Sequence, residues 1–145
     1  GLIGYKSSPG GGTTDYAVNI FYAAIKNRTF DCFLNPKEIL PMMYMPDAIE
    51  ASIQLMEADP NRLIHRNAFN VTAMPLDPQT LADEIKKHIP NFTIEYKIDQ
   101  DRESIAQSWP RTIDDSVAKK EWDWSPKYNI KSMTAEMIAE LSHSS

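Results

Sequence analysis

A glycine-rich stretch directly before a helical pattern carries the clearest potential for chemistry in this sequence. Residues 9–16 are Pro-Gly-Gly-Gly-Thr-Thr-Asp-Tyr. Three consecutive glycines let the backbone approach a ligand closely, and a threonine is a good N-cap for the helix that follows. The unpaired amides and positive dipole at such a helix start suit a small anion, such as a carboxylate or phosphate. A flexible loop that happens to precede a capped helix explains the same residues equally well.

The apolar spacing after this loop predicts the helix that would position it. We expect this helix to open at Thr13 and to run to about Asn27. One of its faces is formed by apolar residues at i, i+3, i+4 and i+7, which are Ala17, Ile20, Phe21 and Ala24.

Helices alternate with short strands along the rest of the chain, which indicates an α/β protein. A strand ends near Ile3, and Ile49, Ile53 and Met56 give the helix that begins at Pro46 its apolar face. Further strands are expected over residues 30–34, 40–45, 68–71 and 92–98, and further helices over about 77–89, 114–122 and 133–141. The polar stretch 99–108 is expected to form a loop or a short helix.

Composition limits the class of protein. The chain has 145 residues, 42% of them hydrophobic and 24% charged, which is typical of one globular domain with a modest core. The net charge of -5, without a basic stripe, argues against a nucleic-acid partner. No apolar run has the length of a membrane span. Cys32 is the single cysteine, which favours a reducing compartment.

The start of the sequence is unusual. All five glycines lie within the first twelve residues, and the chain begins Gly1-Leu2-Ile3 without an initiator methionine. We therefore expect a fragment that starts at the end of a strand, with a core that is part of a larger one.

Other reactive side chains have ordinary explanations. Tyr22 and Lys26 lie one helical turn apart, and a nearby cation can lower the pKa of a tyrosine that acts as a base. A half-exposed helix face explains this pair as well. His65, His88 and His143 lack the spacing of metal ligands, so no metal site is expected.

Trp109 stands between Ser108 and Pro110, where a large aromatic side chain either covers a ligand site or plugs a hydrophobic gap. Asp114 and Asp115 are explained by capping and first-turn charge of the next helix. The sequence has no nucleophile with an obvious base and no phosphate-binding glycine fingerprint.

Taken together, these motifs resemble the L-threonine 3-dehydrogenase branch of the extended short-chain dehydrogenase/reductases. The resemblance covers nearly the whole chain, and its most distinctive parts are the glycine-rich stretch and the Pro-Met-Met-Tyr stretch. The matching segments are residues 1–3, 9–17, 40–45, 108–110, 114–116 and 122–124.

The resemblance is to the C-terminal half of the family's Rossmann-type fold, which carries a small α/β substrate-binding lobe. It implies that residues 1–4 and 47–73 complete the Rossmann domain and that residues 5–46 and 74–145 form the lobe. The family's nucleotide-binding part and catalytic Tyr-x-x-x-Lys lie upstream and are absent here. No catalytic residue is therefore expected in this sequence.

The resemblance also implies a site and a reaction. The nicotinamide end of NAD would lie beside three backbone positions, Gly1, Leu2 and Ile3. L-Threonine would be held by three loop residues, Gly12, Thr13 and Thr14, and Trp109 would close the pocket. The family oxidises the β-hydroxyl of threonine to a ketone, giving 2-amino-3-oxobutyrate, with hydride transfer to NAD.

Family members imply a homodimer in the cytoplasm, or in the mitochondrial matrix of an animal. Two alternatives remain open. A nucleotide-sugar epimerase or dehydratase of the same superfamily needs basic residues for a diphosphate, and Arg111 is the clear candidate near the closing loop. A non-catalytic binding module would instead fold cooperatively as this chain alone.

Overall fold

The computed structural model describes residues 1–65 and 68–143 and consists of short strands and helices. The strands are β1 (Leu2–Ile3), β2 (Thr29–Cys32), β3 (Leu40–Tyr44), β4 (Met74–Leu76) and β5 (Thr93–Tyr96). The helices are η1, a 3₁₀ turn (Thr13–Asp15), α1 (Tyr16–Lys26), α2 (Met45–Glu57), α3 (Pro78–His88), α4 (Gln100–Gln107), α5 (Ser116–Trp122) and α6 (Ile130–His143). The expected α/β class is confirmed.

The strands form two small sheets. In the first, β1 pairs in parallel with β3, which pairs antiparallel with β4. In the second, β2 and β5 pair in parallel along their full lengths. Strand β1 therefore lies at the edge of its sheet, with one side unpaired among the described residues.

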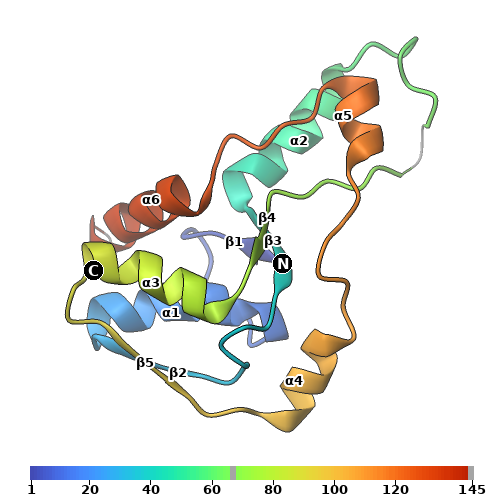
Figure 1. Cartoon of the computed structure of the whole chain (residues 1–145). Coiled ribbons are helices and arrows are strands. Elements are labelled where there is room, and N and C mark those ends of the chain that lie inside the picture. Colours follow the sequence, from blue (N-terminus) through green and yellow to red (C-terminus); the bar gives the residue numbers. More distant parts are fainter. Residues whose placement is uncertain (66–67, 144–145) are drawn as a thin grey trace.

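The hydrophobic side chains form two cores. The helices of the smaller one, α2 and α5, lie together at one end of the molecule (Figure 1). The larger core joins α1, α3 and α6 to the strands, and its fully buried side chains include Tyr16, Phe21 and Leu81. The smaller core joins α2 to α5 through Ala51, Trp122 and Trp124. Helix α5 thus packs with α2.

The predicted strand over residues 68–71 is wrong. This segment is irregular, and Phe69 and Val71 pack against the smaller core instead of joining a sheet. A strand forms at Met74–Leu76, where Pro75 is tolerated because β4 is an edge strand.

Two helices near the C-terminus differ in detail from expectation. The stretch 99–108 contains α4, whose N-cap Asp99 accepts amide hydrogen bonds from Asp101 and Arg102. Helix α6 begins at Ile130, earlier than expected, because the Asn129 side chain caps its first turn.

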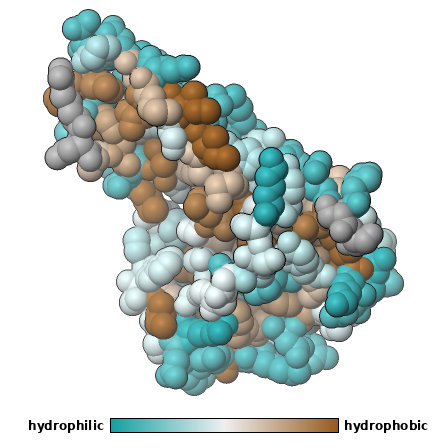
Figure 2. All heavy atoms as spheres, turned by 180° about the vertical axis from the view of Figure 1, so that it is seen from behind, coloured by the Kyte–Doolittle hydropathy of each residue, from teal (hydrophilic) through white to brown (hydrophobic). Residues whose placement is uncertain are grey.

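The apolar face predicted for α2 is exposed in this chain, and Asp47 and Ala51 are the buried residues of the helix. Ile49 is 55% exposed, Ile53 39% and Met56 78%. Figure 2 shows apolar surface gathered at the end of the molecule that holds α2 and α5. Within the described residues, no helix has the length and apolar character of a membrane span.

Candidate functional site

The glycine-rich loop closes onto the 3₁₀ turn through Asp15. Gly11 has a φ of +93°, a backbone conformation that glycine adopts easily. The amide of Gly12 donates to Asp15 Oδ2 at 2.9 Å, and the amide of Asp15 donates to the Gly12 carbonyl at 3.1 Å. Gly12 is thus the N-cap residue, and the expectation that a threonine side chain caps this turn is wrong.

These hydrogen bonds limit which amides of the loop could bind an anion. The Gly12 amide is already bound to a carboxylate, whereas Thr13 and Thr14 are the first residues of the turn and have no acceptor for their amides within it. The negative charge of Asp15 beside them opposes a strongly anionic ligand. A zwitterion, with its carboxylate at the turn and its ammonium toward Asp15, suits the seat better.

Thr14 lies directly against Gly1. A Cβ built on Gly1 would lie 2.7 Å from Thr14 Cβ, 2.8 Å from Thr14 Cγ2 and 2.7 Å from Met42 Sδ. These separations are too short for non-bonded atoms, so only a glycine fits there without movement of its neighbours. The structure therefore brings one predicted cofactor residue and one predicted substrate residue into contact.

Gly1 and Leu2 also line an apolar cavity of about 310 Å³. The backbone of Gly1 is fixed by β3, since its nitrogen donates to the Pro41 carbonyl at 2.8 Å and its carbonyl accepts from Met43 at 2.9 Å. Leu2 is half-exposed, whereas Ile3 is buried in the larger core. Of the three predicted cofactor residues, two therefore face this cavity.

Trp109 follows the end of α4, a helix that packs against η1. Its amide donates to the Ala106 carbonyl at 3.1 Å, and 40% of its surface is exposed. Among the described residues, no hydrogen bond or ring contact joins Trp109 to Thr13 or Thr14. Trp109 therefore directly follows a helix that packs against η1, the turn that contains Thr13 and Thr14.

Arg111 lies near two buried carboxyl groups. Burial, followed by the neighbouring Glu103, raises the pKa of Glu38, and the positive charge of Arg111 opposes this rise. Glu103 also accepts a hydrogen bond from the Asn35 amide at 2.9 Å. Arg111 is therefore close enough to Glu38 to influence the pKa of that carboxyl group.

The other reactive side chains lie outside this region. Tyr22 and Lys26 line a different cavity with Ile25 and Leu141, about two helical turns or more from Thr14. His65 Nδ1 lies 2.6 Å from the buried carboxyl of Glu121. Within residues 1–65 and 68–143, no group of three or more potential metal ligands comes together.

Sequence reasoning missed the role of Asp15. The signal was present, because an acidic residue three positions after an N-cap is the second half of a capping box. It also missed Asp47, a buried carboxylate in the first turn of α2. No sequence pattern identifies its partners, which lie 80 and 81 residues further along the chain.

No protein-family model matches the chain. An uncharacterized epimerase/dehydratase from Staphylococcus haemolyticus is 45% identical over 141 residues, which cover 97% of this chain and 44% of that relative. A protein of the same description from Staphylococcus aureus is 46% identical with the same coverage. The chain thus spans less than half the length of these curated relatives.

Solved structures show the same relationship. L-threonine dehydrogenase from Phytophthora infestans superposes with a TM-score of 0.96 at 43% identity, covering all of this chain and 47% of that one. The enzyme from Clostridium difficile gives 0.95 at 50% identity, covering 99% and 45%. The match is to the C-terminal portion of these Rossmann-type enzymes.

Proposed function

We propose that this chain, which corresponds in sequence and fold to the C-terminal half of L-threonine dehydrogenases among the extended short-chain dehydrogenases, is the substrate-binding part of an NAD-dependent L-threonine 3-dehydrogenase. The whole protein would oxidise L-threonine to 2-amino-3-oxobutyrate. We further propose that it acts as a homodimer in the cytoplasm, or in the mitochondrial matrix of an animal.

The contact between Thr14 and Gly1 carries this proposal. It joins the loop that offers amides and hydroxyls for an amino acid to the strand beside the apolar cavity. A substrate held at Thr13 and Thr14 would thus lie next to whatever occupies that cavity. Holding two reactants in this way is a large part of catalysis in a hydride transfer.

The lining of the cavity fits the nicotinamide end of NAD. Gly1 and Leu2 present backbone and an aliphatic side chain, and Met42 and Met43 add apolar surface. NAD, when bound, accepts a hydride from the substrate carbon. The residues of this chain would orient the amino acid through Thr13 and Thr14, while Trp109 would reduce the access of water.

The rest of the enzyme would pack on the α2 side of the molecule. Ile49, Ile53 and Met56 form an exposed apolar stripe there, and β1 is an edge strand in a parallel pair. Parallel sheets are normally covered on both faces, so this surface fits a preceding Rossmann half that supplies the base and most of the NAD site.

A nucleotide-sugar epimerase or dehydratase is the second candidate, and the names of the curated relatives favour it. Two observations oppose it. Asp15 places negative charge at the glycine-rich loop, and Arg111 lies close enough to Glu38 to oppose the rise in the pKa of that carboxyl group. A diphosphate would need an excess of positive charge at its binding site.

Steady-state assays of the whole protein test the proposal. With NAD present, L-threonine should produce NADH, and the rate should saturate with threonine. UDP-sugars should neither support the reaction nor release heat on titration. Turnover of a UDP-sugar without turnover of threonine would reject the dehydrogenase in favour of the second candidate.

The non-catalytic module makes a different prediction. It requires the 145-residue chain alone to unfold in one sharp transition without binding a hydrophobic dye. The proposed half-enzyme should bind the dye through the exposed stripe on α2.

A further inference from the structure

We propose that Asp47 is a positioning residue for the amino-acid site, because it anchors the segment of Tyr128, which packs on the same core as Tyr5, ahead of the glycine-rich loop. Asp47 itself contacts neither Thr13 nor Thr14 in the described structure. The inference deepens the proposed function and rests on it for the identity of the substrate.

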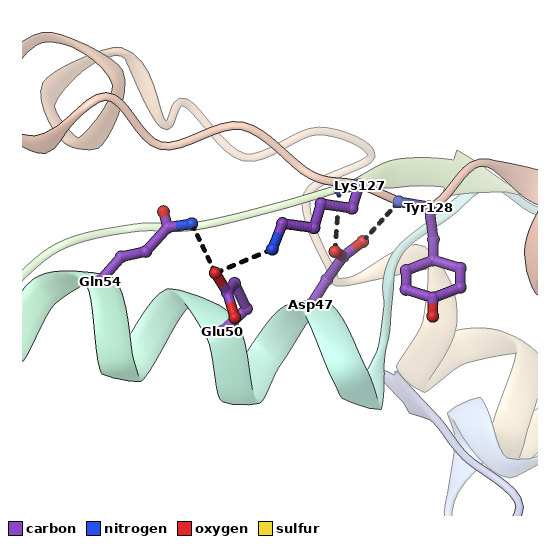
Figure 3. A network of polar contacts seen from close by, with 5 residues as sticks. All are labelled: Asp47, Glu50, Gln54, Lys127 and Tyr128. Atoms are coloured by element: carbon purple, nitrogen blue, oxygen red, sulfur yellow. Dashed lines mark hydrogen bonds and ion pairs between the residues drawn. The ribbon is translucent and has the colours of Figure 1, made fainter.

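The carboxylate of Asp47 holds a distant stretch of backbone. It is buried, with 1% of its surface exposed. Its Oδ1 accepts the amide of Lys127 at 2.9 Å and its Oδ2 accepts the amide of Tyr128 at 3.1 Å (Figure 3). Two consecutive amides on one carboxylate fix both the position and the direction of the segment that connects α5 to α6.

An exposed contact reinforces this anchor one helical turn further along α2. Glu50 Oε1 accepts Lys127 Nζ at 2.9 Å and Gln54 Nε2 at 3.1 Å (Figure 3). Because the Lys127 and Glu50 side chains are in contact with water, this ion pair contributes little. The buried bonds of Asp47 therefore hold Lys127 and Tyr128 more strongly than this ion pair does.

The anchored segment places Tyr128 against the end of β3. The rings of Tyr128 and Tyr44 lie edge to face, with centroids 4.8 Å apart. The Tyr44 hydroxyl donates to Glu136 Oε1 on α6 at 3.1 Å. Burial and the charge of Glu136 raise the pKa of Tyr44, so the hydroxyl keeps the proton that it donates.

The chain between β1 and the glycine-rich loop starts beside Tyr44. Tyr44 pairs with Ile3 in the β1–β3 register. The next residue, Gly4, is so close to α2 that a Cβ built on it would lie 3.2 Å from Met45 Cβ. Tyr5 follows, near enough to both tyrosine rings to affect their pKa values. At its far end the loop returns to Gly1 through Thr14.

The contacts therefore lead from Asp47 through Tyr128 and Tyr44 to the end of β1, from which the chain continues into the glycine-rich loop. Loss of the Asp47 carboxylate would release the segment that holds Tyr128. The threonine site would then lose its geometry without losing any group that touches the substrate.

The test compares Asp47→Asn with Glu50→Gln in the whole protein. The first substitution keeps the shape of the side chain but leaves one acceptor oxygen instead of two. The control, Glu50→Gln, removes the carboxylate charge on the same helix that pairs with Lys127 Nζ. Hydrogen exchange followed by mass spectrometry should show exchange about tenfold faster or more at Lys127 and Tyr128, and faster exchange over residues 4–14, in Asp47→Asn alone.

Kinetics should separate positioning from general stability. We expect KM for L-threonine to rise about tenfold in Asp47→Asn, while NAD affinity stays unchanged and kcat falls by less than about twofold. Glu50→Gln should match wild type. Equal KM values and equal loop exchange in the two variants would overturn the inference, as would an equal loss of NAD affinity.

A second variant covers the case in which Asp47→Asn does not fold. Tyr128→Leu leaves the backbone amides on Asp47 but removes the ring contact with Tyr44, and it should raise KM for threonine in the same way. An unchanged KM in Tyr128→Leu would contradict the inference. If wild type does not oxidise threonine at all, the proposed function fails, while the exchange comparison still decides whether Asp47 positions the loop.

Discussion

Thr14 packs its side chain against the backbone of Gly1, and the space between them does not admit a single additional carbon. A Cβ on Gly1 would lie 2.7 Å from Thr14 Cβ and 2.7 Å from Met42 Sδ. Under the proposed function this contact sets the distance between the amino acid and the cofactor. The side chains on both sides of it should therefore tolerate little change.

Replacement of Gly1 by alanine should impair the whole protein. The added carbon must push Thr14 or Met42 aside, and overpacking of this kind costs about 1–3 kcal/mol. We expect lower kcat/KM for threonine together with a lower melting temperature. A Gly10→Ala variant is the matched control, because a Cβ there meets its nearest neighbour at 3.7 Å. Equal behaviour of the two variants would contradict the proposed contact.

Substitutions of Thr13 and Thr14 should weaken the use of threonine and leave the binding of NAD nearly unchanged. Thr13→Ala and Thr14→Ala should each weaken threonine use by about 1–3 kcal/mol, the cost of losing a hydrogen bond to a charged group, with NAD affinity nearly unchanged. Thr14→Val keeps the methyl packing on Gly1 and loses the hydroxyl, so it should resemble Thr14→Ala. Wild-type kinetics in all of these variants would remove the proposed anchoring role.

Trp109→Ala should raise KM for threonine through incomplete closure of the pocket. The side chain is 40% exposed, so its loss should change the melting temperature of the whole protein only slightly. Trp109→Phe should recover most of the loss because it restores an aromatic cover. An unchanged KM and kcat in Trp109→Ala would make the side chain a surface residue without a role in the site.

The exposed stripe on α2 should behave differently in the chain alone and in the whole protein. Replacing Ile49, Ile53 and Met56 with glutamine should reduce dye binding by the 145-residue chain and leave its helix content intact. In the whole protein the same change should destabilise by about 2 kcal/mol per buried side chain.

Chemical denaturation of both forms measures this difference. Glu57→Gln, at an exposed position of the same helix, provides a control that should alter neither form. Unchanged stability of the triple variant in the whole protein would show that nothing packs on the stripe.

Glu38 should make stability depend on pH. Burial, then Glu103, raises its pKa, so the folded protein holds this proton more tightly than the unfolded chain does. The contribution of Glu38 to the stability of the folded protein is therefore complete below the ordinary pKa of a glutamate. It is lost as pH rises through the raised pKa of the folded state. Glu38→Gln cannot ionise, so its melting temperature should fall less than that of wild type between mildly acidic and neutral pH. Parallel profiles for the two proteins would contradict this assignment.

Much of the fold followed from local patterns. The period of apolar residues predicted α1, and Asp77 followed by Pro78 predicted the start of α3, where the Asp77 side chain accepts the Thr80 amide at 2.7 Å. The alternation over residues 92–98 predicted β5. In each case neighbouring residues in the chain contain the information.

The failures concern partners that are distant in sequence. The face of α2 reads as a core face but is exposed here, because none of the described residues covers it. Residues 68–71 read as a strand but have no neighbouring strand to pair with among the described residues. No sequence pattern assigns a role to Asp47, because its partners Lys127 and Tyr128 are set by the tertiary fold alone.

The site shows the same division. The glycine-rich loop was recognisable from its composition, and the spacing of Asp15 after Gly12 carried the signal of a capping box, whereas the contact of Thr14 with Gly1 depends on the tertiary fold. Under the proposed function, the negative charge of Asp15 beside the turn favours a zwitterionic amino acid over a diphosphate.

The most direct test is a crystal structure of the whole protein with NAD and L-threonine. The account predicts electron density for the amino acid at the turn formed by Thr13 and Thr14, with its carboxylate within hydrogen-bond distance of both residues and the nicotinamide ring beside Gly1. Density for threonine at a site remote from this turn, with the nicotinamide bound elsewhere, would contradict it.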